Sequence, residues 1–311
     1  MSSWFEILGK KNEKREVAMP GHGDHWSTLY DVDSYIQEGI ARDCQEATLI
    51  CKAPCRDVKH GTERAEAVVC LRRGSPRLAN QILLVSDSPA RSHYLFSAYP
   101  VALEGITYPL TIRRVEPWEY GVEGWIHAAV TEEDVSVTFF DTMFFTGSAD
   151  LQPGSVVEYS LAGLAYRLAP IRLRSFAVRT GALWEMERQR RLEEGESEER
   201  ADRPVDVHMT GAAIFLPRDG DQCDEAQFQG VIEAINVFDH DDQKVYRLEM
   251  VLMRPGDDEF RLPVYVSERA LEGYVPRNGD DVEGSMWVQG RQIEAESVPN
   301  MEAQIESIII E

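Results

Sequence analysis

The residues of this 311-residue chain most able to do chemistry are four clustered cysteines and one nearby histidine. They are Cys44, Cys51, Cys55 and Cys70, with His60 between the last two. Three thiolates and an imidazole could hold zinc in a tetrahedral site. However, no CxxC spacing occurs, and Cys70 lies in the apolar run AVVCL, where a cysteine packs as a small hydrophobe. We therefore expect free or buried thiols and no metal at this group.

Two further kinds of cluster are weaker metal candidates. His22 and His25 lie in the glycine-rich segment GHGDHW near the start of the sequence, which is typical of a flexible surface loop. Acidic clusters, which could bind a hard cation through oxygen, occur at three places. These are Asp219, Asp221 and Asp224, then Asp239, Asp241 and Asp242, then Asp257, Asp258 and Glu259. None has the order of an EF-hand, and charged residues are common at loop tips, so we expect no specific cation site.

Motifs of nucleophilic and nucleotide-dependent catalysis are absent from the sequence. There is no GxSxG, GxxxxGK[ST], GxGxxG or HExxH segment. His127 is the one histidine on a clearly predicted central strand, and no partner acid can be assigned to it. The sequence thus predicts no catalytic residue and no cofactor. An enzyme of an unrecognised type stays open as an alternative, because β-barrels host many chemistries.

One predicted surface could bind a ligand, and we call it the ring face. Side chains alternate across a strand, so Trp125, His127 and Phe140 would share the face opposite the apolar core positions. Arg113 and Arg114 on the preceding strand would border these rings. Rings edged by arginine suit single-stranded nucleic acid. Residues 1–105 are long enough to cover this face, however, and we expect them to do so.

The N-terminal part of the chain, residues 1–105, is predicted to contain an arm, a helix and several strands. Residues 1–30 are polar and predict a loosely ordered arm. Residues 31–44 have the capping and apolar spacing of a helix. Strand-like runs separated by turn residues follow, so residues 31–105 are predicted to form an α+β segment that packs on the next domain.

Two series of strand-like runs follow, in residues 106–181 and 207–298, and they predict an internal duplication. Gly124–Ala129 matches Gly230–Ile235, and Gly154–Leu161 matches Gly279–Met286. Each series has three strands, a short glycine-containing segment and a last strand. That order resembles a small five-stranded Greek-key barrel of the OB type. An SH3-like barrel or a β-sandwich fits the same order.

The predicted fold class is therefore mainly β (α+β), with two OB-like barrels in tandem. A charged helix or linker at residues 182–206, ALWEMERQRRLEEGESEERA and its continuation, would join them. A C-terminal tail would occupy residues 299–311. A basic island lies around the start of the helix and comprises Arg167, Arg172, Arg174, Arg179, Arg188, Arg190 and Arg191.

The charge balance limits the classes of partner. Lys and Arg total 32 and Asp and Glu total 54, for a net charge of −22. From residue 201 onward there are 24 acidic and 9 basic residues, a net of −15, which leaves −7 for residues 1–200. A strongly acidic chain repels nucleic acid and anionic membranes, although such a surface can also serve solubility alone.

These features predict a non-enzymatic binding or scaffold protein whose β-barrel modules contact another protein. The alternative is a single-stranded nucleic-acid-binding protein that uses the ring face of the first barrel. No apolar run is long enough to span a bilayer, and no secretory signal is evident, so we expect a cytoplasmic protein without membrane contact. The sequence identifies neither the partner nor the oligomeric state.

Overall fold

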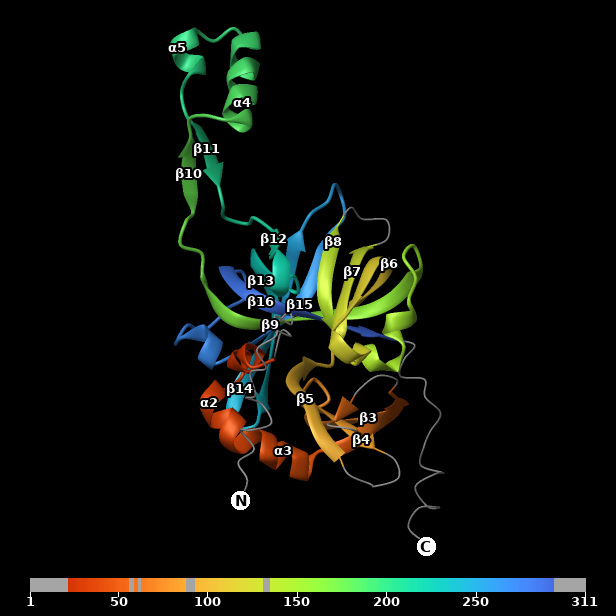
Figure 1. The fold of residues 1–311 in the computed structure, drawn as a ribbon. Helices are drawn as coiled ribbons and strands as arrows, with labels where there is room; N and C mark the ends of the chain where they lie inside the picture. Colours follow the sequence, from red (N-terminus) through yellow and green to blue (C-terminus); the bar gives the residue numbers. More distant parts are fainter. Residues whose placement is uncertain (1–21, 56–58, 61–62, 88–92, 131–134, 294–311) are drawn as a thin grey trace, which may run out of the picture.

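A computed structural model describes residues 22–55, 59–60, 63–87, 93–130 and 135–293 (Figure 1). This part of the chain is mainly β, as the sequence predicted. It contains no helix that is long and apolar enough to cross a membrane. The predicted tail at residues 299–311 lies outside the described residues.

The N-terminal segment is helical and lies against both sheets described below. A short 3₁₀ helix precedes one longer helix that contains a π-helical turn. The elements are η1 (Asp24–Thr28), α2 (Val32–Ser34), the π turn η2 (Tyr35–Gly39) and α3 (Ile40–Glu46). The side chain of Asp31 caps this longer helix by accepting a hydrogen bond from the Ser34 backbone N–H. The helix predicted over residues 31–44 is confirmed.

The first sheet is an antiparallel meander with the strand order β1-β3-β4-β5 and a short strand, β2, beside β3. The strands are β1 (Thr48–Pro54), β2 (Lys59–His60), β3 (Glu63–Gly74), β4 (Leu78–Asp87) and β5 (His93–Ala102). Gly74 at the β3–β4 turn has a φ of +147°, and a Cβ there would collide with the backbone of Leu78 and Ala79. A glycine is therefore required at this turn.

In the described residues, the second sheet has nine strands. They are β6 (Ile106–Pro117), β7 (Gly124–Val130), β8 (Ser136–Asp141), β9 (Val156–Pro170), β12 (Ile214–Pro217), β13 (Glu225–His240), β14 (Gln243–Met253), β15 (Phe260–Ser267) and β16 (Asp281–Gln292). Short 3₁₀ turns connect several of them: η3 (Glu119–Gly121), η4 (Phe144–Thr146), η5 (Ser148–Asp150), η6 (Gly220–Gln222) and η7 (Arg269–Leu271).

Hydrogen-bonded pairing closes this sheet into two circuits that share β9 and β16. One circuit runs β6-β7-β8-β16-β9 and returns to β6, and the other runs β13-β14-β15-β9-β16 and returns to β13. The links β8–β16 and β15–β9 are parallel, and the others are antiparallel. Two independent barrels in tandem are therefore not confirmed, because each circuit closes with a strand from the other half of the chain.

The predicted sequence repeat is half consistent with this topology. Gly154–Leu161 and Gly279–Met286 lead into β9 and β16, which hold equivalent places in the two circuits. The other match is wrong, because Gly124–Ala129 lies in β7, whereas Gly230–Ile235 lies in β13, which takes the place of β6 in the second circuit. A shared alternation of apolar residues and a leading glycine produced that false match.

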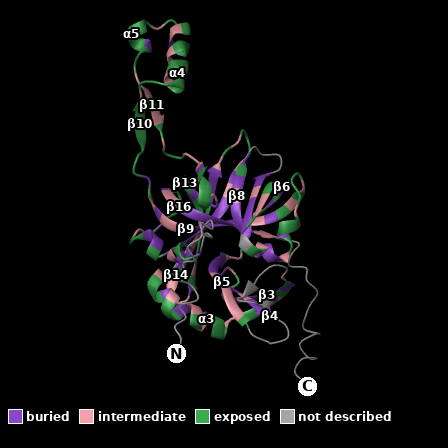
Figure 2. Cartoon of the chain, in the orientation of Figure 1, coloured by how far each residue is buried: buried purple, intermediate pink, exposed green. Residues whose placement is uncertain are grey.

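Two apolar cores stabilise the fold. One fills the interior of both circuits without a break and includes Phe139, Tyr159 and Phe260. The other lies between the outer face of the nine-stranded sheet and the N-terminal sheet and helix, and includes Tyr99 and Trp287. Figure 2 shows buried residues throughout the large sheet. The N-terminal part therefore packs as a second layer on that sheet.

Residues between β9 and β12 form an arm that projects from the body (Figure 1). Its stalk is the ribbon of β10 (Ser175–Val178) and β11 (Val205–His208), and its tip carries α4 (Ala182–Glu193) and α5 (Glu198–Ala201). Both feet of the arm bond to Asp281: the Ile171 N–H donates to its carbonyl at 3.0 Å, and the Gly211 N–H to its carboxylate at 2.7 Å. The helix predicted in residues 182–206 is present, but it lies at the tip of the β10–β11 hairpin and does not separate two barrels.

Candidate functional site

The predicted ring face is covered by the N-terminal part of the chain. The alternation was predicted correctly, since Trp125 and Phe140 face away from the interior of the circuits. Both rings are buried: Trp125 is 7% exposed and Phe140 is 0% exposed. The ring of Trp118 packs against both, and His22 lies 4.7 Å from Phe140 between ring centroids. No ring platform is open to a ligand here.

His127 and the two arginines of the ring face lie at its exposed edge. The imidazole Nδ1 lies 2.9 Å from Thr138 Oγ1, and its Nε2 lies 3.2 Å from a Glu116 carboxylate oxygen. Burial and the charge of Arg114 lower the pKa of His127. Arg113 falls at a bulge in the pairing of β6 with β7 and is exposed. The histidine thus joins neighbouring strands, and both of its ring nitrogens are engaged.

His22 and His25 are buried, so the prediction of a flexible loop for them is wrong. The ring of His25 stacks on Trp287 at 3.8 Å, and that of His22 stacks on Trp118 at 5.2 Å. His22 Nε2 lies 3.2 Å from a Glu123 carboxylate oxygen. The loosely ordered arm predicted for residues 1–30 is therefore wrong for residues 22–30, and residues 1–21 lie outside the described part.

The cysteine group does not assemble into a ligand set in the described residues, where no three potential metal-ligating side chains gather. Cys51 and Cys70 face each other across β1 and β3, whereas Cys44 is exposed. A hydrogen bond from Cys70 lowers the pKa of Cys51, and that same bond together with burial raises the pKa of Cys70. The side chain of His60 lies outside the described part.

The acidic clusters were expected at solvated tips, and this is wrong for Asp224. This residue is 3% exposed and accepts a 2.7 Å hydrogen bond from Trp287 Nε1. Burial raises the pKa of Asp224. Asp241 is also engaged in the folded structure, as part of a partly buried junction described next.

A partly buried group of polar side chains joins the N-terminal helix, the first sheet and the β13–β14 hairpin, and we call it the junction. Arg73 links three acids: its Nη1 lies 3.1 Å from Asp43 and 2.8 Å from Asp241, and its Nε lies 2.7 Å from Glu46. Tyr30 donates a 2.8 Å hydrogen bond to Asp241. The Arg73–Asp241 and Tyr30–Asp241 contacts connect residues 168 and 211 positions apart in sequence.

Asp241 has a φ of +50° at the hairpin tip. Although burial alone would raise its pKa, the hydrogen bond from Tyr30 and the charges of His240 and Arg73 lower the pKa of Asp241. Burial and the Asp241 charge raise the pKa of Tyr30, so its hydroxyl stays protonated and donates. The junction therefore holds matched charges in fixed positions.

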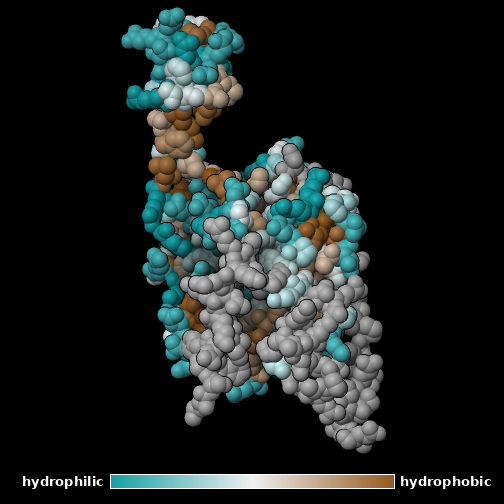
Figure 3. Space-filling view, in the orientation of Figure 1, coloured by the Kyte–Doolittle hydropathy of each residue, from teal (hydrophilic) through white to brown (hydrophobic). Residues whose placement is uncertain are grey.

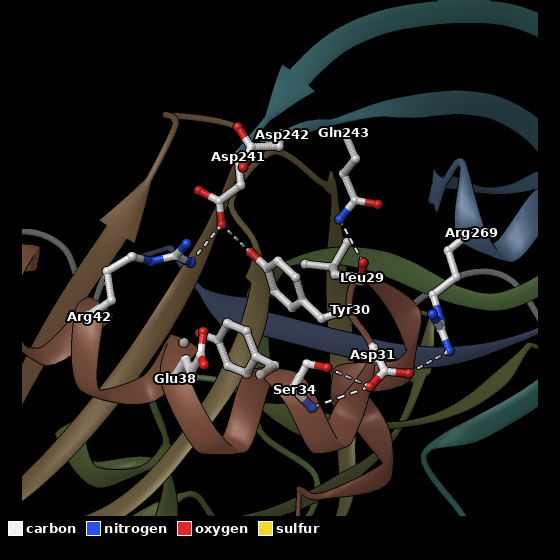
Figure 4. A pocket seen from close by; sticks show the side chains of 12 residues that line it. Leu29, Tyr30, Asp31, Ser34, Glu38, Arg42, Asp241, Asp242, Gln243 and Arg269 are labelled. Carbon is white, nitrogen blue, oxygen red and sulfur yellow. Dashed lines mark hydrogen bonds and ion pairs between the residues drawn. The ribbon is translucent and has the colours of Figure 1, made fainter.

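A cavity of about 390 Å³ opens beside the junction, between the N-terminal helix and the β13–β14 hairpin (Figure 4). Tyr30, Arg42 and Asp241 point into it, and Asp31 pairs with Arg269 at its rim. Arg42 lies 3.1 Å from Asp241. Because its central charges already pair with one another, the cavity offers no activated nucleophile or base among the described residues that line it.

The body exposes several large apolar side chains, including Val156 and Val237, and the arm exposes four. The exposed fractions on the arm are 54% for Leu173, 41% for Phe176, 43% for Leu183 and 65% for Met186. Figure 3 shows a hydrophobic collar on the stalk, between a largely polar tip and the body. These four residues, with Arg172, Arg174 and Arg179, are called the arm surface below.

The ribbon itself is amphipathic. Phe176 pairs with Val207 and Val178 with Val205, so four apolar side chains share one face of the stalk. In the described residues no further strand pairs with β10 or β11. The stalk thus presents an apolar face and open strand edges to solvent.

Charges divide between the tip and the stalk of the arm. At the tip, Arg190 pairs with Glu187 and Glu194, Arg188 pairs with Asp202, and Arg191 is buried, where it donates to the carbonyls of Ala201 and Arg203. On the stalk, Arg172 lies 3.9 Å from Glu283, and Arg174 and Arg179 form no ion pair within the described residues. The basic island predicted from sequence is therefore neutralised at the tip and available on the stalk.

A second cavity of about 390 Å³ lies at the foot of the arm. It is lined by Arg167, Arg218 and Leu216 among others, and Leu216 is 56% exposed. Glu283 also lines it and approaches Arg172 of the stalk. Arg167 and Leu216 therefore extend the arm surface onto the body, whereas Arg218 pairs with Glu225 at 3.0 Å.

Sequence reasoning missed both the junction and the arm surface as sites. The junction left no local signal, since Arg42 and Asp43 look like ordinary helix residues and Asp241 looks like an ordinary turn residue. The arm surface did leave a local signal in the sequence. Residues 171–181 contain three arginines and no acidic residue, and the large apolar residues Leu173 and Phe176 lie between these arginines.

No protein-family model, curated protein or solved structure matches this chain.

Proposed function

We propose that the chain is a non-enzymatic binding or scaffold protein that contacts another protein through the arm surface. The observation that carries this proposal is the exposure of Leu173, Phe176, Leu183 and Met186 on one projecting element. Exposed apolar residues that cluster on a protein surface often mark a site of contact with another molecule.

The stalk also has a physical reason to acquire a partner. A two-stranded ribbon is marginally stable in water, because it cannot bury its apolar face. Phe176, at 41% exposure, keeps a large ring partly in water on that face. A partner that covers the ribbon would remove this apolar area from water, which stabilises a complex by about 25 cal/mol for each Å² buried.

The body would serve as the rigid mount of the arm. We propose that its two circuits are OB-like barrels fused through β9 and β16, supported by the order of three strands, a 3₁₀ turn and a last strand in each half. We retain the cytoplasm as the proposed location. The nucleic-acid alternative loses its main support, because Trp125 and Phe140 are buried.

The test places a photo-crosslinking amino acid at Phe176, with Val275 as the control position. Val275 is 61% exposed but lies outside the arm. A protein crosslinked only from position 176 would be purified and its affinity measured by calorimetry. We expect Phe176→Ser with Met186→Ser to weaken binding tenfold or more, and Val275→Ser to leave it unchanged. Crosslinking no different from the control, or unchanged affinity in the double variant, would overturn the proposal.

A further inference from the structure

The charge and apolar pattern of the arm surface matches one segment of the chain itself. Residues 171–181, IRLRSFAVRTG, carry three arginines and no acid. Residues 294–311 carry five glutamates and no Lys, Arg or His, and they include the run Ile308-Ile309-Ile310. An acidic, apolar segment is the chemical complement of a basic, apolar stalk.

We infer that residues 297–311 of a second copy of this chain bind the stalk of the arm, so that two copies exchange these segments. This inference rests on the proposed function, since it names the partner of the arm surface. Each copy carries one stalk and one such segment, so a reciprocal exchange closes into a dimer with twofold symmetry.

The spacing of charges supports addition of this segment to the open edge of β10. Arg174 and Arg179 are five residues apart, and so are Glu306 and Glu311. Both glutamates can therefore face both arginines when the segment lies alongside β10. In the parallel register that sets Glu306 opposite Arg174, Ile308 lies opposite Phe176 and Ile310 opposite Val178. Charges and apolar side chains are then matched on the same strand pair.

One antiparallel register of two β10 strands is disfavoured by the same charges. An antiparallel pair centred between Phe176 and Ala177 would set Arg174 opposite Arg179 of the other copy. Like charges directly opposite on paired strands are destabilising. In that register the arginines favour an acidic segment over a second stalk as the added strand.

Distance favours the segment of a second copy over that of the same copy. Asp281 at the start of β16 bonds to both feet of the arm, and Gln292 ends that strand 11 residues later. At about 3.3 Å per residue, the strand leads the chain roughly 35 Å away from the arm. Glu306 lies 13 residues beyond Ile293, a reach of about 45 Å when fully extended. The return along β16 and the further distance of about 10 Å from Ile171 to Arg174 together equal that reach, so the segment of the same copy could pair with the stalk only when fully extended.

Sedimentation equilibrium of the full chain in the micromolar range tests the exchange. We expect a dimer for the wild type. We also expect at least tenfold weaker dimerisation for Glu306→Lys with Glu311→Lys, and for Arg174→Glu with Arg179→Glu. The variant carrying all four changes should recover dimerisation, because the opposite charges then face each other again. A control variant, Asp33→Lys with Glu38→Lys, makes the same charge change on the exposed face of the N-terminal helix, at the opposite end of the molecule from the arm (Figure 1), and should stay dimeric.

A monomeric wild type, dimerisation unaffected by either charge pair, or failure of the fourfold variant to recover it would overturn the inference. Circular dichroism would establish that each variant is folded. The crosslink from position 176 separates this failure from that of the proposed function. If the wild type is monomeric but position 176 crosslinks to another protein, only the inferred exchange between two copies is wrong. If the wild type is monomeric and position 176 gives no specific crosslink, both the exchange and the proposed function are wrong.

Discussion

At the scale of single residues, the junction is held by a carboxylate that has no access to water. Asp43 is 0% exposed and accepts hydrogen bonds from Tyr35 and Asn80, the latter at 2.6 Å. Arg42 and Arg73 lie 3.3 and 3.1 Å from its other oxygen. A buried charge with this many partners is stable only while all of them are present.

Replacing Asp43 with alanine should therefore destabilise the fold severely. The change would leave the Tyr35 hydroxyl without its acceptor. It would also remove one acceptor each from the Asn80 amide and two guanidinium groups, which keep their contacts to Tyr30, Asp241 and Glu46. We expect a loss of about 3–5 kcal/mol in the free energy of unfolding, measured by urea denaturation. Glu38→Ala, an exposed change on the same helix, should stay within about 0.5 kcal/mol of the wild type. A loss below about 1 kcal/mol for Asp43→Ala would show that the junction does not anchor the helix.

His25 should make stability depend on pH near neutrality. Burial and the neighbouring His22 hold the pKa of His25 well below its usual value. The folded state therefore binds fewer protons than the unfolded state as the pH falls through about 6.5, and stability must decrease below that pH, continuing down to the folded pKa. The slope from this group is at most about 1.4 kcal/mol per pH unit.

His25→Phe isolates that contribution, because it keeps a ring against Trp287 and removes the titration. Other groups that titrate, including His127 and His240, are unchanged in the variant. We expect urea denaturation from about pH 7 to about pH 5 to show a shallower loss of stability in the variant. Parallel curves for the two proteins would contradict the argument.

At the scale of elements, three strands meet at Gly290, which pairs with Asp141 of β8 and Leu161 of β9. A Cβ at this position would overlap the ring of the buried Phe139. Gly290→Ala should cost about 1–3 kcal/mol by overpacking, measured by thermal or urea denaturation. Phe139→Leu should be less harmful in that variant than in the wild type, because the smaller side chain makes room.

Gly23→Ala is the matched control for this change. Nothing lies within 4 Å of a Cβ built there, and the φ of Gly23 is −53°, which any residue adopts. The control should therefore leave stability within about 0.5 kcal/mol of the wild type. Equal effects of the two substitutions would mean that the meeting of the strands is not tightly packed.

How much the sequence predicts also differs between elements. The alternation in residues 124–130 and 135–140 correctly placed Ile126 and Phe139 inside and Trp125 and Phe140 outside, because a strand has only two faces. The sequence does not predict that β9 belongs to both circuits. This sharing depends on two residue pairs, Val264 with Gly163 and Tyr265 with Leu164, and parallel contacts between distant strands leave no periodic signal.

At the scale of the whole molecule, a long insertion emerges from the body without interrupting it. Arm residues 172–210 connect β9 to β12, and both feet are fixed at Asp281. The body closes through β9 and β16, which come from the two sides of that insertion. The two halves of the body are therefore held together by strand pairing and do not depend on the connecting arm.

Limited proteolysis should show this directly. Cleavage is expected first between α4 and α5, where Gly195, Glu196 and Ser197 lie at the exposed tip of the arm, far from either apolar core. The two fragments should remain together in native size-exclusion chromatography and separate only in denaturant. The reason is that β9 of the first fragment pairs with β15 and β16 of the second, and β16 also pairs with β8. Fragments that separate without denaturant would mean that each half folds as an independent barrel, and first cleavage within residues 230–290 would contradict the packing of both circuits.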